Sequence, residues 1–195
     1  EMQRSLVGSE MCIRDRFKER VDSINSSIKN DILPKVADAE KTAREYFDNT
    51  GNVIIPNFPF EIMSNYTVNL NNPKLISIYN DYYEYLGGAH GNTIRTSYNV
   101  DKQNVRLLML QDLFIKNSNY KDIINKEIVR QINLEPDIYF DSGKDFKGIK
   151  DNQGYYLTGE NLIIYYQLYE IAPYVAGIRE FKIPLKMFGE NYLYH

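Results

Sequence analysis

The chain has 195 residues, of which 43% are hydrophobic and 25% charged, and its formal net charge is −3. This composition suits one globular domain, or two small packed lobes, with a hydrophobic core. The slight acidity excludes a general basic field for nucleic acid or anionic lipid, and no apolar run approaches the roughly 20 residues of a membrane-spanning helix. We expect no nucleic-acid partner, and membrane contact only through an anchor that is missing upstream.

The first sixteen residues differ in origin from the rest. One choice of codons for residues 6–16, LVGSEMCIRDR, reproduces an adapter used in transposase-based sequencing libraries. We therefore interpret residues 1–16 as adapter-derived translation and expect the native chain to begin near Phe17. The single cysteine, Cys12, lies in this stretch, so we expect no disulfide or thiolate chemistry in the remainder. Because the sequence before Phe17 would then be missing, the lack of a signal peptide or membrane anchor does not indicate where the protein is located.

A helical pattern runs from Phe17 to about Phe47, with apolar residues every three or four positions on one face. Pro34 removes one backbone donor, which predicts a kink or two abutting helices. Asn49 and Gly51 suit the end of the helix, and the prolines of residues 52–59 predict an extended crossing segment. The apolar face consists of Phe17, Val21, Ile24, Ile28, Ile32, Val36, Ala39, Ala43 and Tyr46.

After Pro59 the apolar period changes to two, which indicates strands. The first group of predicted strands forms an antiparallel meander, and the turns between them are rich in asparagine. The loop YLGGAHGNT, residues 85–93, joins its second and third strands. These strands are expected over residues 62–70, 75–86, 93–100 and 105–110.

The second half repeats the order of helix and then strands. Asn117 or Ser118 can cap a helix that runs to about Asn133, and strands are expected over 155–158, 162–171 and 178–183 before a short helix that begins at Pro184. We predict an α+β fold in which both helices pack on antiparallel meanders. Residues 17–110 and 111–195 are expected to pack together as one module.

The glycine-rich loop is the first candidate for chemistry. His90 is the sole internal histidine, no G-x-S-x-G nucleophile accompanies it, and GGAHG matches neither dinucleotide nor Walker phosphate loops. One histidine with scattered carboxylates also falls short of a zinc or calcium site. We predict no catalytic residue, metal or cofactor. The loop is expected to be a tight connection whose shape His90 holds, with partner contact as the alternative; its residues are Gly87, Gly88, His90, Gly91 and Asn92.

Tyrosine is unusually frequent, with 17 residues and no tryptophan. Tyrosine buries a large area at small entropic cost and keeps a polar tip, which suits a partner surface. The alternative is that these rings cover the sheet beneath the helices, and the sequence leaves both interpretations open. The candidates for a partner surface are Tyr79, Tyr83 and Tyr85 on the second strand, and Tyr165, Tyr169 and Tyr174 in the second meander.

Four segments in this order resemble a bacterial extracellular module of unknown function. They are YYEYLGGAHGNTIRTSYNVD (82–101), LMLQDLF (108–114), YKDIINKEI (120–128) and LIIYYQLYEIAPYVAGIREFKIPL (162–185). The module is found in RsiV-type anti-sigma factors, which act as lysozyme receptors, and in the N-terminal part of PdaC-type peptidoglycan deacetylases. The resemblance spans about Phe17 to Leu185.

The resemblance implies a non-catalytic binding or sensing module of a Gram-positive cell-surface protein. Its partner would be a lysozyme-like protein or a cell-wall glycan, and the full-length protein would be extracellular and membrane-anchored. The alternative is an accessory domain of a cell-wall polysaccharide deacetylase whose catalytic domain is missing from this sequence. The sequence lacks both the family's tether and a downstream deacetylase motif, so both branches remain open.

Overall fold

The computed structural model describes the backbone of residues 2–49 and 60–195 and the side chains from Phe17 onward within those ranges. Two α-helices and two antiparallel sheets form the described part, with short 3-10 helices between them. The main elements are α1 (Met2–Asn49), β1 (Glu61–Asn71), β2 (Leu75–Tyr85), β3 (Asn92–Asp101), β4 (Arg106–Leu107), α2 (Tyr120–Ile132), β5 (Tyr155–Leu157), β6 (Asn161–Tyr166) and β7 (Arg179–Pro184). The 3-10 helices are η1 (Leu110–Leu113), η2 (Pro136–Ile138), η3 (Phe140–Gly143), η4 (Tyr174–Ala176) and η5 (Leu185–Asn191).

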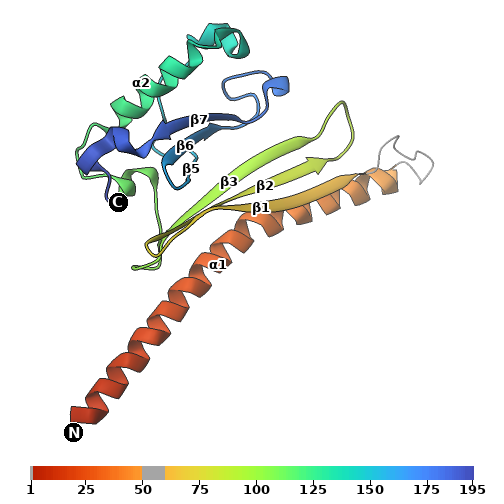
Figure 1. Cartoon of the computed structure of the whole chain (residues 1–195). Helices are drawn as coiled ribbons and strands as arrows, with labels where there is room; N and C mark the ends of the chain where they lie inside the picture. Colours follow the sequence, from red (N-terminus) through yellow and green to blue (C-terminus); the bar gives the residue numbers. More distant parts are fainter. Residues whose placement is uncertain (1, 50–59) are drawn as a thin grey trace.

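The elements form four layers, which Figure 1 shows from bottom to top. Helix α1 lies on one face of the first sheet, whose order is β1-β2-β3-β4. The second sheet, in the order β5-β6-β7, packs on the other face through contacts of β5 with β1, β2 and β3, and α2 packs on β7. The predicted α+β class and both meanders are confirmed.

The alternation of side chains along β2 explains how its sheet is covered on both sides. Tyr82 points toward α1 and donates its hydroxyl to the carbonyl of Lys35 at 3.2 Å. Ser77, an odd-numbered residue, points the other way, and its hydroxyl accepts the backbone N–H of Leu157 in β5 at 2.8 Å. One strand therefore contacts α1 with one face and the second sheet with the other.

A bulge in β1 moves Leu70 from one face of the sheet to the other. Val68 pairs with Ile78 and Leu70 pairs with Ser77, so Asn69 is the extra residue in β1. An extra residue reverses the alternation of side chains beyond it. Leu70 consequently packs against the main hydrophobic core, on the side of Ser77 rather than that of α1.

Helix α1 is one continuous helix that contains Pro34, so the two-helix alternative is wrong; Figure 1 shows its axis bending along its length. It extends back to Met2 and ends at Asn49, as the sequence predicts for its end. Of the predicted apolar face, Ala39 is buried, whereas Phe17 and Val21 are exposed. The predicted extended segment 52–59 lies outside the described residues.

The second half follows the predicted order, and one strand in each sheet is shorter than predicted. Helix α2 places the predicted Ile124, Ile128 and Ile132 in the core. Strand β6 ends at Tyr166, five residues earlier than expected, and β4 consists of Arg106 and Leu107 alone. The largest fully buried side chains are Tyr82, Phe181, Phe188, Leu75, Leu113, Ile124, Ile128, Leu157, Leu162, Ile164 and Ile183.

Candidate partner-binding cleft

The loop between β2 and β3 uses its glycines in two different ways. Gly87 and Gly88 have φ of 93° and 105°, in the left-handed region that favours glycine, as the sequence predicts. Gly91 has no positive φ; instead, a β-carbon on Gly91 would collide with the ring of Tyr83. Gly91 is therefore required by packing, and the turn itself is carried by Gly87 and Gly88.

His90 connects this loop to the second sheet. Its Nδ1 lies 2.9 Å from the carbonyl oxygen of Gly91, and its Nε2 lies 3.1 Å from the hydroxyl of Tyr169. Because a carbonyl can only accept, Nδ1 carries the proton, and in the neutral imidazole Nε2 then accepts from Tyr169. The imidazole also stacks on the ring of Tyr174, with centroids 3.8 Å apart and planes 21° from parallel.

The connection segment of residues 169–174 therefore holds the loop from the other side. The hydroxyl of Tyr174 donates to the carbonyl of Gly91 at 2.9 Å, next to the bond from His90. Tyr85 donates to the carbonyl of Gly88 at 3.0 Å and closes the loop from β2. GGAHG (87–91) and YEIAPY (169–174) belong to two of the four segments that carry the family resemblance, and we call them the signature segments. They thus meet at one end of the molecule.

Two hollows flank Tyr174, and together with it they form what we call the docking cleft. The first has a volume of about 380 Å³ and is lined by Glu61, Tyr83, Tyr85, Gly88, Ala89, His90, Gly91 and Tyr174. The second has a volume of about 570 Å³ and is lined by Thr93, Arg95, Leu168, Tyr174, Val175, Gly177, Ile178 and Glu180. Val175 is 91% exposed and Tyr169 is 54% exposed at this end. Val175 and Tyr169 therefore offer exposed contact area beside the hollows.

The structure separates the six candidate tyrosines into two groups. Tyr83, Tyr85, Tyr169 and Tyr174 lie at the docking cleft. Tyr165 is only 4% exposed, and Tyr79 packs on Tyr156 with ring centroids 5.0 Å apart, so both fill the space between the two sheets. Tyr79 and Tyr165 therefore cover a sheet, as in the alternative interpretation, but they lie beneath the other sheet rather than beneath the helices.

Arg95 lies at the floor of the docking cleft and joins the two sheets, a role that the sequence did not indicate. Its side chain is 10% exposed, its Nε and Nη2 each donate to Asp81 at 2.7 Å, and it also pairs with Glu180 of β7. The guanidinium lies 3.8 Å from the ring centroid of Tyr79, a cation–π distance. On the backbone, Arg95 exchanges two hydrogen bonds with the side-chain amide of Gln167.

These contacts fix the charge states around Arg95. Burial alone would lower the pKa of Arg95, but the hydrogen bonds and charge of Asp81, together with Glu180, raise it overall. Burial, followed by the charge of Glu180, raises the pKa of Tyr156, whose hydroxyl donates to Glu180 at 3.1 Å. The guanidinium therefore remains charged and the phenol remains a donor throughout the physiological pH range.

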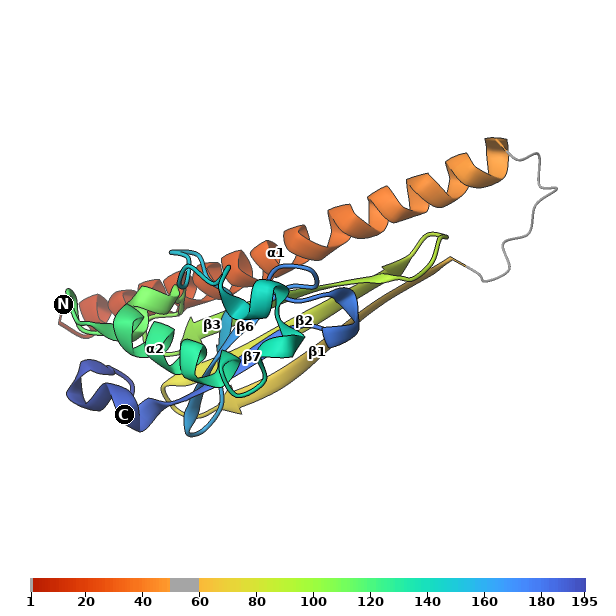
Figure 2. The ribbon, with the colours of Figure 1, turned by 90° about the horizontal axis from the view of Figure 1, so that it is seen from above.

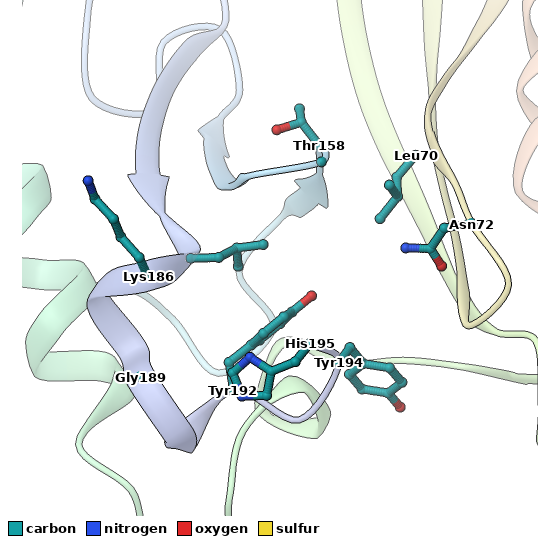
Figure 3. A pocket seen from close by; sticks show the side chains of 10 residues that line it. Leu70, Asn72, Thr158, Lys186, Gly189, Tyr192, Tyr194 and His195 are labelled. Carbon is teal, nitrogen blue, oxygen red and sulfur yellow. The ribbon is translucent and has the colours of Figure 1, made fainter.

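The other histidine, His195, lies at the opposite end of the molecule. Figure 3 shows it beside a hollow of about 230 Å³ between the β1–β2 turn and the C-terminal segment, together with Asn72, Thr158 and Tyr192. Burial raises the pKa of Tyr192 to about 12.

Within residues 17–49 and 60–195, no group of three histidine, cysteine or acidic side chains is placed to hold a metal ion. No described helix has the length and apolar composition to cross a membrane.

Two family models match separate parts of the chain. The one described as Deacetylase PdaC matches residues 12–93, and the one described as Protein of unknown function (DUF3298) matches residues 111–186. Anti-sigma-V factor RsiV of Bacillus subtilis (strain 168) is 28% identical over 184 residues, which cover 87% of this chain and 63% of RsiV. Peptidoglycan-N-acetylmuramic acid deacetylase PdaC of the same bacterium is 25% identical over 108 residues, 53% of this chain and 23% of PdaC. The chain spans less than two thirds of either relative.

Solved structures share the fold. A DUF3298 family member from Bacteroides fragilis NCTC 9343 superposes with a TM-score of 0.62 at 25% identity, over 85% of this chain and 68% of that one. A DUF3298 family protein from Pseudomonas aeruginosa PAO1 gives 0.56 at 21% identity, over 76% of this chain and 68% of that one. The resemblance inferred from the sequence motifs is confirmed.

Proposed function

We propose, from the premise that this chain resembles RsiV along most of its length and PdaC in its first half, that it is a binding and sensing module without catalysis of its own. The docking cleft is the observation that carries the proposal. Both signature segments are used to build this end, and its hollows are lined by tyrosine, glycine and exposed apolar side chains. These are the residues of a contact surface.

The proposed partner is a lysozyme-like protein that inserts into the docking cleft. The sequence resemblance to lysozyme receptors supplies this partner, and Val175 and Tyr169 offer apolar contacts at the rim. The carboxylate of Glu61 lines the first hollow and suits a partner whose surface is basic, whereas Glu180 in the second hollow is already paired with Arg95. The module would act outside the cell, as part of a membrane-anchored protein of a Gram-positive bacterium.

Titration calorimetry of the full chain with hen egg-white lysozyme tests this proposal. We expect binding, and we expect Val175→Asp to weaken it at least about tenfold, the effect of losing about 1.4 kcal/mol at a contact residue. Leu193→Asp is the matched control, because Leu193 is also an exposed apolar residue but lies in the C-terminal segment at the other end.

Two outcomes would count against the lysozyme proposal. The first is no detectable heat with lysozymes of several sources, while circular dichroism shows that the chain is folded. The second is equal weakening by Val175→Asp and Leu193→Asp, which would place the contact outside the docking cleft.

A second candidate is an accessory domain of a cell-wall deacetylase. The match of residues 12–93 to the PdaC model supports it, as does the similarity to a relative whose name specifies peptidoglycan. In this case the docking cleft would take soluble peptidoglycan fragments rather than lysozyme, and Tyr174→Ala would abolish their binding. Neither candidate predicts acetate release from peptidoglycan by this chain, and such release would contradict the absence of catalysis that both assume.

A further inference from the structure

Strand β1 forms an open edge of the first sheet. Among the described residues it pairs only with β2, and Figure 2 shows it along one long side of the molecule while α1 runs along the other. Every second N–H and C=O of an edge strand points away from its sheet and can pair with another strand. The straight part of this edge is residues 61–68, because the bulge at Asn69 interrupts the pairing beyond Val68.

The side chains of residues 61–68 do not protect this edge. The sequence EIMSNYTV contains one charged residue, Glu61, at its end, and neither lysine nor proline, the residues that commonly block edge pairing. Its apolar side chains are exposed, with values of 43% for Met63, 74% for Tyr66 and 46% for Val68. A long, uncharged and partly apolar edge of this kind is a template for strand addition.

The other sheet edges of the described part are protected, which sets β1 apart. Strand β4 has two residues and pairs only with Val100 and Asp101 of β3. Along the rest of that edge, the side-chain amide of Gln167 bonds the backbone N–H and carbonyl of Arg95 and blocks the middle of β3. Strand β5 has three residues, and side chains of the first sheet cover its backbone: the amide of Asn99 donates to the carbonyl of Tyr155 at 3.0 Å, and Ser77 accepts from Leu157. Strand β7 carries Arg179, Glu180, Lys182 and Pro184 within six residues. The fold therefore blocks three edges and leaves the longest one open.

We propose that β1 pairs with β1 of a second copy of this chain, antiparallel and about a two-fold axis perpendicular to the sheet. This symmetry keeps α1 on the same face in both copies and joins the two four-stranded sheets into one. In registers centred near Asn65, Glu61 of one copy lies opposite uncharged residues near Asn69 of the other, so the carboxylates stay apart. Tyr66 and Val68 then lie on one face across the seam.

A second copy fits this edge better than a foreign peptide does. Isologous pairing uses up both open edges, whereas an added peptide strand would itself present a new edge to solvent. Antiparallel pairing also turns the two docking clefts toward opposite ends of the assembly. The proposal does not depend on the function of the cleft, so each can fail without the other.

The test is the mass of the full chain in solution, measured by light scattering and sedimentation over a range of concentrations. We expect a dimer, with slower amide hydrogen exchange in residues 61–68 as the concentration rises. Tyr66→Lys places like charges across the seam and should raise the dimer dissociation constant at least about tenfold. Val175→Lys is the matched control, because it adds the same charge at an exposed apolar residue of the docking cleft.

The circular dichroism spectrum and melting temperature of both variants are checked against those of the unchanged chain, so that misfolding is not mistaken for dissociation. A chain that stays monomeric at the highest concentration overturns the proposal, even if it binds added β-strand peptides. A dimer that Val175→Lys breaks and Tyr66→Lys leaves intact overturns it as well, since the interface would then lie elsewhere.

Discussion

Gly91 illustrates, for a single residue, why substitutions in the loop of residues 85–93 should be costly. The ring of Tyr83, at the end of β2, occupies the space where a side chain on Gly91 would lie. We expect Gly91→Ala to lower the free energy of unfolding by about 1–3 kcal/mol, the usual cost of overpacking. Urea denaturation measures this difference.

The matched control for this prediction is Gly159→Ala. Gly159 has no atoms within 4 Å of its missing β-carbon and no positive φ, so this substitution should leave the free energy of unfolding almost unchanged. If Gly91→Ala is equally neutral, the ring of Tyr83 moves aside at little cost and the packing argument is wrong.

Sequence reasoning captured the local half of this loop and missed the distant half. The positive φ of Gly87 and Gly88 and the bond from His90 to a neighbouring carbonyl follow from residue type and position. The stack of His90 on Tyr174 does not follow from the local sequence. Tyr174 lies 83 residues after Gly91, the neighbour of His90, and only folding brings the two segments together. Val175 and Arg95 were missed for the same reason.

Arg95 links elements, because its guanidinium in β3 bonds Asp81 in β2 and Glu180 in β7. Removing one partner of a buried pair leaves the other charge uncompensated. We expect Arg95→Gln to cost about 2–3 kcal/mol of stability, below the roughly 3–5 kcal/mol of a fully buried pair because Asp81 is partly exposed. The double variant with Asp81→Asn should cost less than the sum, by about 1 kcal/mol or more.

A surface ion pair provides the control for this double-mutant cycle. Lys121 and Asp151 also pair, but their side chains are 43% and 85% exposed, so Lys121→Gln and Asp151→Asn should show no measurable coupling. Equal coupling in the two cycles would mean that burial between the sheets adds nothing to the Arg95 contacts.

Elements with a regular apolar period were predicted well, whereas the end of a strand was predicted poorly where local polar contacts set it. The three long strands of the first sheet and α2 follow from periods of two and about 3.6. Strand β6 stops at Tyr166 because the N–H of Gln167 bonds the side chain of Glu170 at 2.8 Å and Tyr169 adopts a φ of 63°. The largely apolar sequence of residues 162–171 gave no indication of this turn, so the strand was predicted to continue to Ile171.

The whole described part should unfold as one unit, because the two sheets share buried polar contacts as well as apolar ones. The side chains of Ser77 and Asn99 bond backbone groups of β5, and Arg95 of the first sheet pairs with Glu180 of the second. We expect a single urea transition, coincident by circular dichroism and tyrosine fluorescence. Two separated transitions, or a fragment 111–195 that folds alone, would contradict this expectation.

The sequence predicted that the two parts pack together, but not that their meanders pack sheet on sheet. Periodicity indicates that a strand such as β2 has a buried face, but not which other sheet covers it. Here the groups that join the two sheets are small and polar. Ser77 is fully buried, and its hydroxyl accepts the backbone N–H of Leu157, a bond that a neighbouring strand would otherwise make. A single serine in a strand does not indicate in the sequence that it will bond the backbone of another sheet.

The contact between His90 and Tyr174 also has a consequence for how this fold can be recombined. His90 belongs to the part matched by the PdaC model and Tyr174 to the part matched by the DUF3298 model, yet their rings stack on each other. A chimera that joins the first half of one relative to the second half of another must keep both rings or replace both. The hairpin tip and the distant bend thus form a single structural unit, although they lie far apart in the sequence.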